Sequence, residues 1–255
     1  PSIKGVEVIN MGIPHLTSDQ IYSLFMNEAI DLDPDIVTFY EGINDAARGQ
    51  APETTTQQAK TLVKRIPFIN EVFREFRYRL LSVALFGELT TKHVMIKEFT
   101  EQDLQAHLVG KSEYFIDYLQ RINDVCKQRG ILFMIANQQA KSLIVDREDI
   151  QGVTYAQETG LIGEKLAKTG AMTSEEFYFL THNMLMEEEK QWVMENNIPY
   201  VDVIGAMDSN RHYLNSWVHL NPQGNRIVAN VLTEAILEQL NQQHLQTLDT
   251  SREVQ

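Results

Sequence analysis

Three short stretches of the chain carry residues suited to acyl-transfer chemistry. Gly12 follows "VEVIN", Asn44 lies in "GIND", and His219 lies in "VHLNPQGN". A glycine in a tight turn can present its backbone N–H, and an asparagine amide is a neutral donor, so both can stabilise a developing oxyanion. A histidine can take the proton of a nucleophile and return it to the leaving group. These three residues are therefore candidates for two oxyanion donors and a general base.

Each candidate follows a segment with the pattern of a β-strand. In "VEVIN", which precedes Gly12, apolar and polar residues alternate and several residues are β-branched. A further segment, "ILFMIAN", is the continuous apolar run of a buried strand. A helix that Thr17 or Ser18 can cap separates the first two strands, and strand–helix–strand order predicts a parallel sheet. Ligands of parallel sheets bind at the carboxyl ends of the strands, so the three candidates are expected to face one crevice. The predicted strands are residues 6–10, 34–40, 131–137 and 199–204.

Helical periodicity dominates the remaining segments. Residues 52–130 are far longer than a crossover between two strands requires, and they are interpreted as a large helical insertion over one end of the sheet. A single domain is expected over residues 1–255. Thr173, followed three residues later by Glu176, has the pattern of a capping box and predicts the start of a helix over 174–197.

Composition narrows the class of protein. Lys and Arg number 22 and Asp and Glu 35, which gives a formal net charge of −13. Such a charge disfavours binding to the phosphate backbone of nucleic acids. Cys126 is the single cysteine, no apolar run is long enough to cross a membrane, and the histidines lack the spacing of metal ligands. A globular protein without a metal site is indicated.

The stretches "VINMGIPHLTSDQ", "YEGIND" and "VHLNPQGN" resemble the second, third and fifth sequence blocks of the SGNH hydrolases, also called the GDSL esterase and lipase family. The resemblance implies a three-layer α/β/α, flavodoxin-like fold with a short parallel sheet. It also implies hydrolysis of a small-molecule or glycan ester through a serine acyl-enzyme, with His219 as general base and Gly12 and Asn44 as the oxyanion hole. No cofactor or metal is implied.

The chain departs from the family pattern at the nucleophile. The family serine lies in a Gly-Asp-Ser motif after a first strand, upstream of the glycine block, and no serine of this chain stands in that context. The first residue is Pro1, and the chain starts roughly at the second strand. The missing strand and serine are expected to have been cut away, to lie on another chain, or to have been left out of the sequence. Such a segment is compatible with a bacterial extracytoplasmic or membrane-anchored protein, although the sequence does not define the compartment.

A second departure concerns the partner of the histidine. Ser216 stands three residues before His219, where the family usually has an aspartate. An aspartate orients the imidazole and stabilises its charged form, whereas a serine hydroxyl carries no charge. An inactivating substitution, a natural Ser-His dyad and an acid recruited from elsewhere, such as Asp208, all remain open at this stage.

Two other functions compete with the esterase hypothesis. One is a non-catalytic SGNH-like protein that binds carbohydrate or a protein partner, and the other is a polysaccharide O-acyltransferase. The apolar stripe of residues 69–86 is interpreted as packing within the helical insertion. An alternative is contact with an acyl chain or a membrane surface, to which Arg74, Arg77 and Arg79 would add charge attraction. The sequence does not define the oligomeric state.

Overall fold

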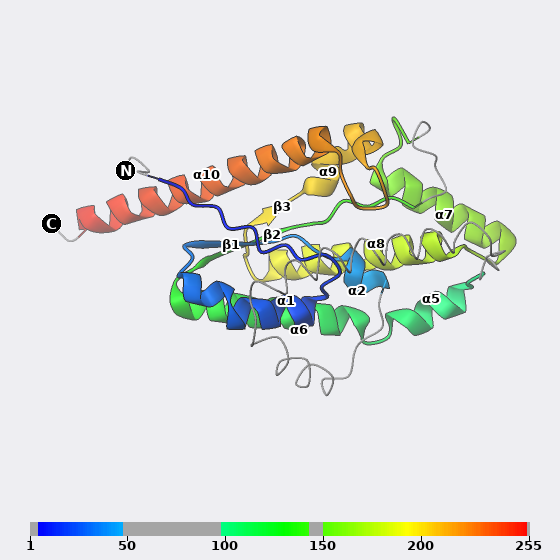
Figure 1. Ribbon diagram of the computed structural model, residues 1–255, viewed down its shortest axis with the longest axis horizontal. Helices are drawn as coiled ribbons and strands as arrows, with labels where there is room; N and C mark the ends of the chain where they lie inside the picture. Colours follow the sequence, from blue (N-terminus) through cyan, green and yellow to red (C-terminus); the bar gives the residue numbers. More distant parts are fainter. Residues whose placement is uncertain (1–4, 48–97, 143–149, 254–255) are drawn as a thin grey trace, which may run out of the picture. The chain divides into compact units, whose positions relative to one another are not determined.

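A three-stranded parallel sheet forms the centre of the computed structural model, which describes residues 5–47, 98–142 and 150–253 (Figure 1). Its strands are β1 (Ile36–Phe39), β2 (Leu132–Ala136) and β3 (Tyr200–Val201), in the order β1-β2-β3. Ile36 lies opposite Leu132, and Ile135 lies opposite Tyr200. The predicted α/β architecture with a short parallel sheet is thus confirmed.

Helices account for most of the described residues. The α-helices are α1 (Ser18–Asn27), α2 (Ile43–Ala47), α5 (Glu101–Leu108), α6 (Lys111–Arg129), α7 (Tyr155–Thr169), α8 (Ser174–Glu195), α9 (Val203–Met207) and α10 (Pro222–Glu253). Two 3₁₀ helices span Ala29–Leu32 and Asp208–Tyr213. The predicted capping box of α8 is present, because Thr173 N–H donates to Glu176 and Glu176 N–H donates to Thr173 Oγ1. None of the described helices combines the length and apolarity needed to cross a bilayer.

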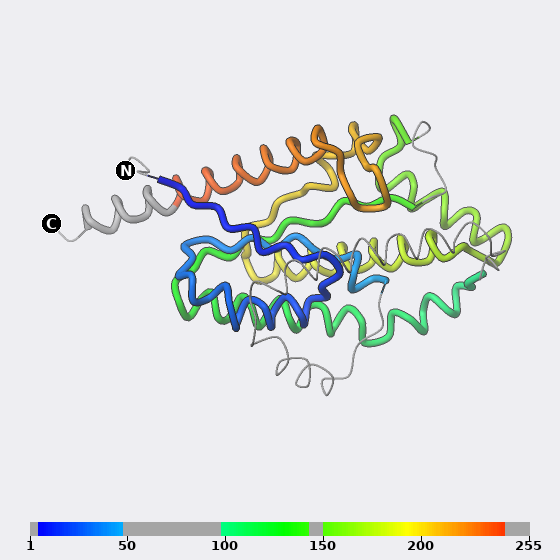
Figure 2. The backbone as a smooth tube through the Cα atoms, viewed as in Figure 1, coloured from blue at the N-terminus to red at the C-terminus, as the bar shows by residue number. Residues whose placement is uncertain are grey.

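The two faces of β2 enter different hydrophobic clusters. Phe133 and Ile135 pack into a cluster with residues of α1, α6 and α8, whereas Met134 and Ala136 pack with residues of α9 and α10. Alternate side chains of a strand point to opposite faces, so helices cover both faces of this sheet. The backbone trace agrees, with α10 on the opposite side of the sheet from α1 and α6 (Figure 2). This is the three-layer arrangement expected from the resemblance.

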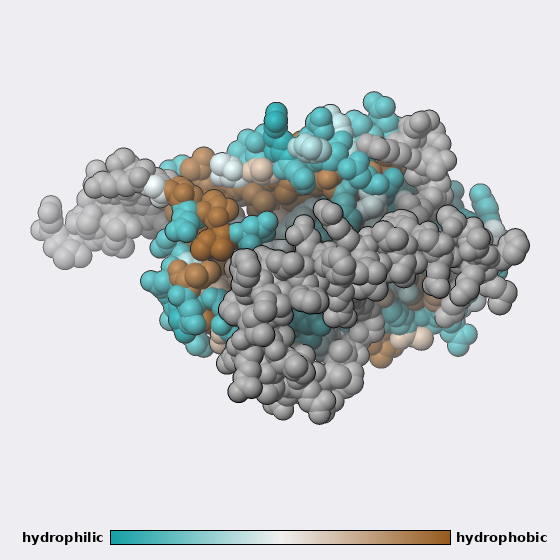
Figure 3. All heavy atoms as spheres, viewed as in Figure 1, coloured by the Kyte–Doolittle hydropathy of each residue, from teal (hydrophilic) through white to brown (hydrophobic). Residues whose placement is uncertain are grey.

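The prediction of a strand at residues 6–10 is wrong for this structure. The segment forms no strand, and Val6, Val8 and Ile9 are 75%, 85% and 49% exposed. The physical reason is that β1 pairs with β2 only, so the described residues offer no neighbouring strand to which the segment could hydrogen-bond. Hydrophobic side chains gather on the surface where this segment runs (Figure 3).

The last strand is shorter than the predicted 199–204. It ends at Val201 because Asp202 accepts a hydrogen bond of 2.9 Å from Gly205 N–H and thereby caps α9. Residues 48–97, with the predicted stripe at 69–86, lie outside the described residues. The helix α6, at the end of the predicted insertion, packs against α1 and β2. The limits of the insertion and the single domain over 1–255 stay predictions.

Candidate active site

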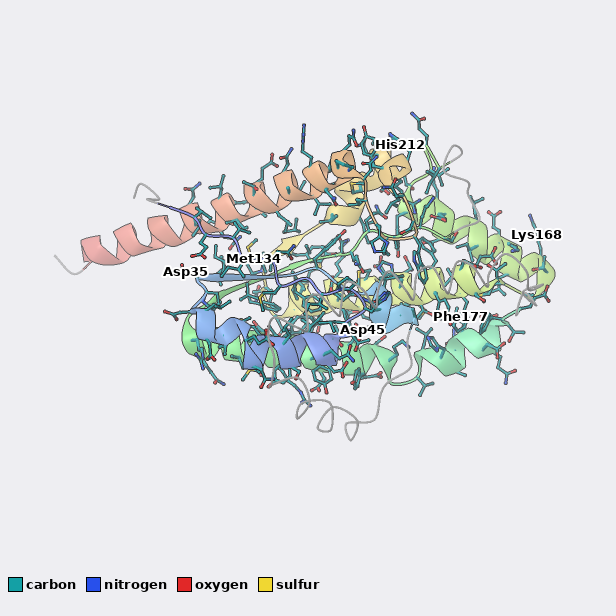
Figure 4. All side chains as sticks on the ribbon, in the orientation of Figure 1. Asp35, Asp45, Met134, Lys168, Phe177 and His212 are labelled. Carbon is teal, nitrogen blue, oxygen red and sulfur yellow. The ribbon has the colours of Figure 1, made fainter. Side chains whose placement is uncertain are left out.

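The loops that follow β1 and β2 are hydrogen-bonded to each other at the carboxyl end of the sheet. Ile43 N–H donates to Gln138 Oε1 at 2.9 Å, and Gln139 N–H donates to Tyr40 Oη at 3.4 Å. Asp35 directly precedes β1, and Asp45 lies on α2, the helix that follows this strand (Figure 4). The predicted site residue Asn44 therefore lies on α2, whose first residue, Ile43, is held by the side chain of Gln138 in the neighbouring loop.

Asp45, on α2, is hydrogen-bonded to the first residue of α1, the helix that follows the Gly12 segment in the sequence. Its carboxylate accepts from Ser18 N–H at 2.9 Å and from Ser18 Oγ at 2.7 Å, at the start of α1. Burial raises the pKa of Asp45 to about 6, although the hydrogen bonds from Ser18 oppose that rise. Asp45 thus has a structural role, because it fixes the first turn of α1 against α2.

The candidate general base, His219, lies in a tight loop ahead of α10. Leu214 and Leu220 form an antiparallel bridge, and Asn215 N–H donates to the His219 carbonyl at 2.7 Å. Lys141 N–H, in the loop after β2, donates to the Trp217 carbonyl at 2.7 Å. The histidine loop is therefore joined to the same end of the sheet as the loops after β1 and β2.

Ser216 is in contact with the histidine ring. Its Oγ lies 2.7 Å from His219 Nδ1, and it accepts from the backbone N–H of His219 at 3.0 Å and of Val218 at 3.4 Å. The imidazole is thus held at Nδ1 by a neutral hydroxyl, in a ring that is otherwise exposed. Asp208, the acid considered as an alternative, accepts from Tyr155 N–H at 2.7 Å and anchors the start of α7.

The two candidate oxyanion donors have other partners in this structure. Gly12 N–H donates to Asn10 Oδ1 at 2.9 Å, on an exposed turn. Asn44 N–H donates to Glu41 Oε1 at 2.9 Å, and the Asn44 side chain also hydrogen-bonds to Glu41. The described hydrogen bonds of Gly12, Asn44 and His219 are therefore made to adjacent polar residues and not to one another.

A buried ion pair supports the loop next to the histidine. Arg211 and Glu158 are both fully buried and bonded to each other, and Arg211 also donates to the Ala140 carbonyl at 2.7 Å. Glu158 in turn accepts from Ser142 N–H at 2.9 Å. Lys141 lies between Ala140 and Ser142 in the sequence. The ion pair therefore fixes the position of Lys141, whose N–H donates to the histidine loop.

Sequence analysis missed Glu41 and the Arg211–Glu158 pair. Glu41 directly precedes the "GIND" stretch, and a carboxyl group at the end of a strand is a signal that could have been used. Arg211 and Glu158 are 53 positions apart, and nothing in the local sequence indicates that they pair. Within the described residues, no group of three or more acidic, histidine or cysteine side chains could hold a metal ion.

The chain belongs to the GDSL-like lipase/acylhydrolase family, whose family model matches residues 2–227. This confirms the resemblance and defines the general class of the protein as an ester hydrolase. Similar solved structures include a GDSL-like lipase from Bacteroides thetaiotaomicron VPI-5482, which is 14% identical, with 89% of this chain and 74% of that chain covered and a TM-score of 0.48. An acetyl xylan esterase is 14% identical, with 90% and 81% covered and a TM-score of 0.49. Among curated proteins, no sequence matches significantly.

Proposed function

We propose that this protein is a serine acyl-ester hydrolase in which His219 is the general base and acid. The observation that carries the proposal is the 2.7 Å contact between Ser216 Oγ and His219 Nδ1, because it fixes the ring and leaves Nε2 for a nucleophile. Gly12 and Asn44 are proposed as the oxyanion donors. The substrate is a small-molecule or glycan ester, and no cofactor takes part.

The reaction follows the chemistry of an activated serine. The serine oxygen attacks the ester carbonyl carbon while its proton passes to His219 Nε2, and the carbonyl oxygen becomes negative. Collapse of this intermediate breaks the bond to the alcohol, which leaves with the proton from His219. Water then attacks the acyl-enzyme in the same way and releases the carboxylic acid.

The nucleophile is proposed to lie on an additional strand between residues 6–10 and β1. Two features support this position. β1 is hydrogen-bonded on one edge only within the described sheet, and its residue Thr38 is exposed. Val6 and Val8 point apolar side chains to solvent from an extended segment, which is unfavourable by roughly 1 kcal/mol or more for each side chain. A strand inserted here would hydrogen-bond to the open edge of β1. It would also bring its serine to the carboxyl end of the sheet.

Ser216 makes His219 a weaker base than an aspartate would. The hydroxyl can accept the Nδ1 proton, which leaves Nε2 free, or can donate to Nδ1, which places the ring proton on Nε2. Only the first arrangement can take a proton from a serine. Because Ser216 Oγ already accepts from the backbone N–H groups of His219 and Val218, its own proton is free to donate to Nδ1, which favours the second arrangement. A slow hydrolase is therefore proposed.

A non-catalytic SGNH-like binding protein is the second candidate. It is favoured by the neutral partner of His219 and by the Gly12 N–H, which is occupied by Asn10. The two candidates differ in one property, since only an activated serine reacts with a fluorophosphonate.

The test compares this chain with one extended by an upstream strand that carries Gly-Asp-Ser. The extended chain is expected to react with a fluorophosphonate probe and to hydrolyse short p-nitrophenyl esters, and His219→Ala is expected to remove both activities. A folded extended chain that reacts with neither reagent would favour the binding protein.

A further inference from the structure

Three aromatic side chains from different parts of the chain, His107, Tyr178 and Trp217, form a continuous row. His107 on α5 lies beside α2, because its Nε2 is 3.0 Å from the carbonyl oxygen of Ala46. Its ring centroid is 6.3 Å from that of Tyr178 on α8. The Tyr178 centroid is in turn 6.5 Å from that of Trp217 in the histidine loop. This aromatic row therefore connects α2 to the histidine loop.

Both ends of the aromatic row are adjacent in sequence to proposed site residues. Ala46, which contacts His107, follows Asn44 by two positions on α2. Trp217 precedes His219 by two positions. A substrate that reaches from the oxyanion donor to the general base would therefore have the aromatic row beside it.

The middle of the aromatic row lies at the carboxyl end of the sheet. Tyr178, His182 and Met186 are spaced four residues apart, so they share one face of α8. A side chain at Gly42, after β1, would lie 3.4 Å from His182 Nε2. Gln138 N–H, after β2, donates to Met186 Sδ at 3.4 Å. Tyr178 is thus one helical turn from the contact between α8 and the loop after β1.

The aromatic row keeps polar groups available at the edges of its rings. All three side chains are partly exposed, and the Tyr178 hydroxyl and the Trp217 indole N–H make no hydrogen bond within the described part of the chain. His107 Nε2 must donate to the Ala46 carbonyl, because a carbonyl oxygen can only accept, and this leaves Nδ1 as an acceptor. Burial lowers the pKa of His107, which favours this neutral form. The row therefore combines apolar ring faces with donors and an acceptor.

A sugar ring has the chemistry that this combination fits. Its C–H bonds form an apolar face that can pack on an aromatic ring, and its hydroxyl groups both donate and accept hydrogen bonds. A fatty acyl chain could cover the same rings, but it would leave the Tyr178 hydroxyl and the Trp217 N–H without partners in a desolvated site, which is unfavourable. The formal net charge of −13 also favours a neutral ligand over an anionic one.

We propose that the aromatic row binds the sugar ring of a glycan ester in which the sugar is the alcohol part. His219 gives its proton to the leaving alcohol, so the alcohol part lies next to the histidine loop, where Trp217 stands. The inference rests on the proposed function in placing the ester group between Asn44 and His219. It names the substrate class of that site and makes Tyr178 and Trp217 its specificity-determining residues.

Tryptophan fluorescence tests this binding without any need for catalysis. The chain has two tryptophans, so Trp192→Phe leaves Trp217 as the only one. O-acetylated oligosaccharides of glucose, xylose, mannose, galactose and N-acetylglucosamine are the probes, and at least one is expected to change the Trp217 emission in a saturable way. Trp217→Phe leaves Trp192, which packs against the core cluster, and is the matched control whose emission is expected to stay constant.

Two substitutions of Tyr178 separate its hydroxyl from its ring. In the Trp192→Phe chain, Tyr178→Phe is expected to weaken sugar binding about threefold or more, because it removes one hydrogen bond. Tyr178→Ala is expected to weaken it about tenfold or more, because it also removes the apolar face. Methyl octanoate is the comparison ligand for an acyl chain, and it is expected to leave the Trp217 emission unchanged.

Three results would overturn the proposal. They are a constant Trp217 emission with every acetylated oligosaccharide, sugar binding that Tyr178→Ala does not weaken, and saturable binding of methyl octanoate alone, which would assign the aromatic row to an acyl chain. If sugar esters bind and the serine-extended chain has no esterase activity, the binding site stands and the proposed function fails. An extended chain that hydrolyses p-nitrophenyl esters and binds no sugar ester gives the opposite result.

Discussion

Ser216 Oγ lies 2.7 Å from Nδ1 of His219, three residues further along the same loop. The hydroxyl also accepts from the backbone N–H of His219, so one serine fixes both the main chain and the ring. This contact answers the question raised by the missing aspartate: the position is filled by a neutral partner that orients the ring without stabilising its charge.

Ser216→Asp is expected to convert this partner into a charged one. The carboxylate should stabilise the imidazolium that forms when His219 takes the proton of the serine, and should increase ester hydrolysis by the serine-extended chain at least tenfold. Initial rates on p-nitrophenyl acetate measure this effect, with Ser216→Ala as control. An unchanged rate in a folded Ser216→Asp chain would contradict the role of His219 as the base.

Glu41→Gln is expected to alter the pH dependence of stability. The folded-state pKa of Glu41, about 7, lies above its ordinary value of 4.5, so the folded chain binds more protons than the unfolded chain between these values. Stability from this group is therefore present at low pH and is lost as the pH rises from about 4.5 to about 7, by roughly 3 kcal/mol. Urea unfolding at pH 5 and pH 7.5 should show a smaller loss in the glutamine variant. An equal loss in both chains contradicts the prediction.

Arg211→Ala is expected to destabilise the fold strongly. It leaves the fully buried Glu158 carboxylate without its cation and removes the donor to the Ala140 carbonyl, which together cost about 3–5 kcal/mol. The double variant Arg211→Met, Glu158→Leu is expected to recover part of that loss, because both charged groups of this buried pair have been replaced by apolar side chains. Chemical denaturation measures both variants, and a double variant less stable than Arg211→Ala alone argues against this account.

The parallel sheet and the helix starts could be predicted from the sequence because they depend on local signals. The capping box at Thr173 and the apolar run of β2 are of this kind. The segment 6–10 has strand-forming residues, but a strand exists only when another strand pairs with it, and the local pattern does not contain that information. Contacts such as Glu41 with Asn44, or Arg211 with Glu158, depend on burial that only the tertiary structure defines.

The substitution Val8→Asp tests whether residues 6–10 form a strand when an upstream strand is present. Because Val8 is 85% exposed here, the change should alter the stability of this chain by less than about 0.5 kcal/mol. In the serine-extended chain, where residues 6–10 are proposed to pair, the same change should cost about 1 kcal/mol or more. Thermal unfolding of the four proteins measures the difference, and equal effects in both backgrounds would count against the proposed strand position.

Fluorophosphonate labelling of the serine-extended chain, with and without His219, tests most directly whether this histidine activates the serine. Stoichiometric labelling is expected at the added serine, and labelling at least a hundredfold slower is expected in the folded His219→Ala variant. Labelling at the same rate in both proteins would show that this histidine does not activate the serine, and the proposed mechanism would be contradicted.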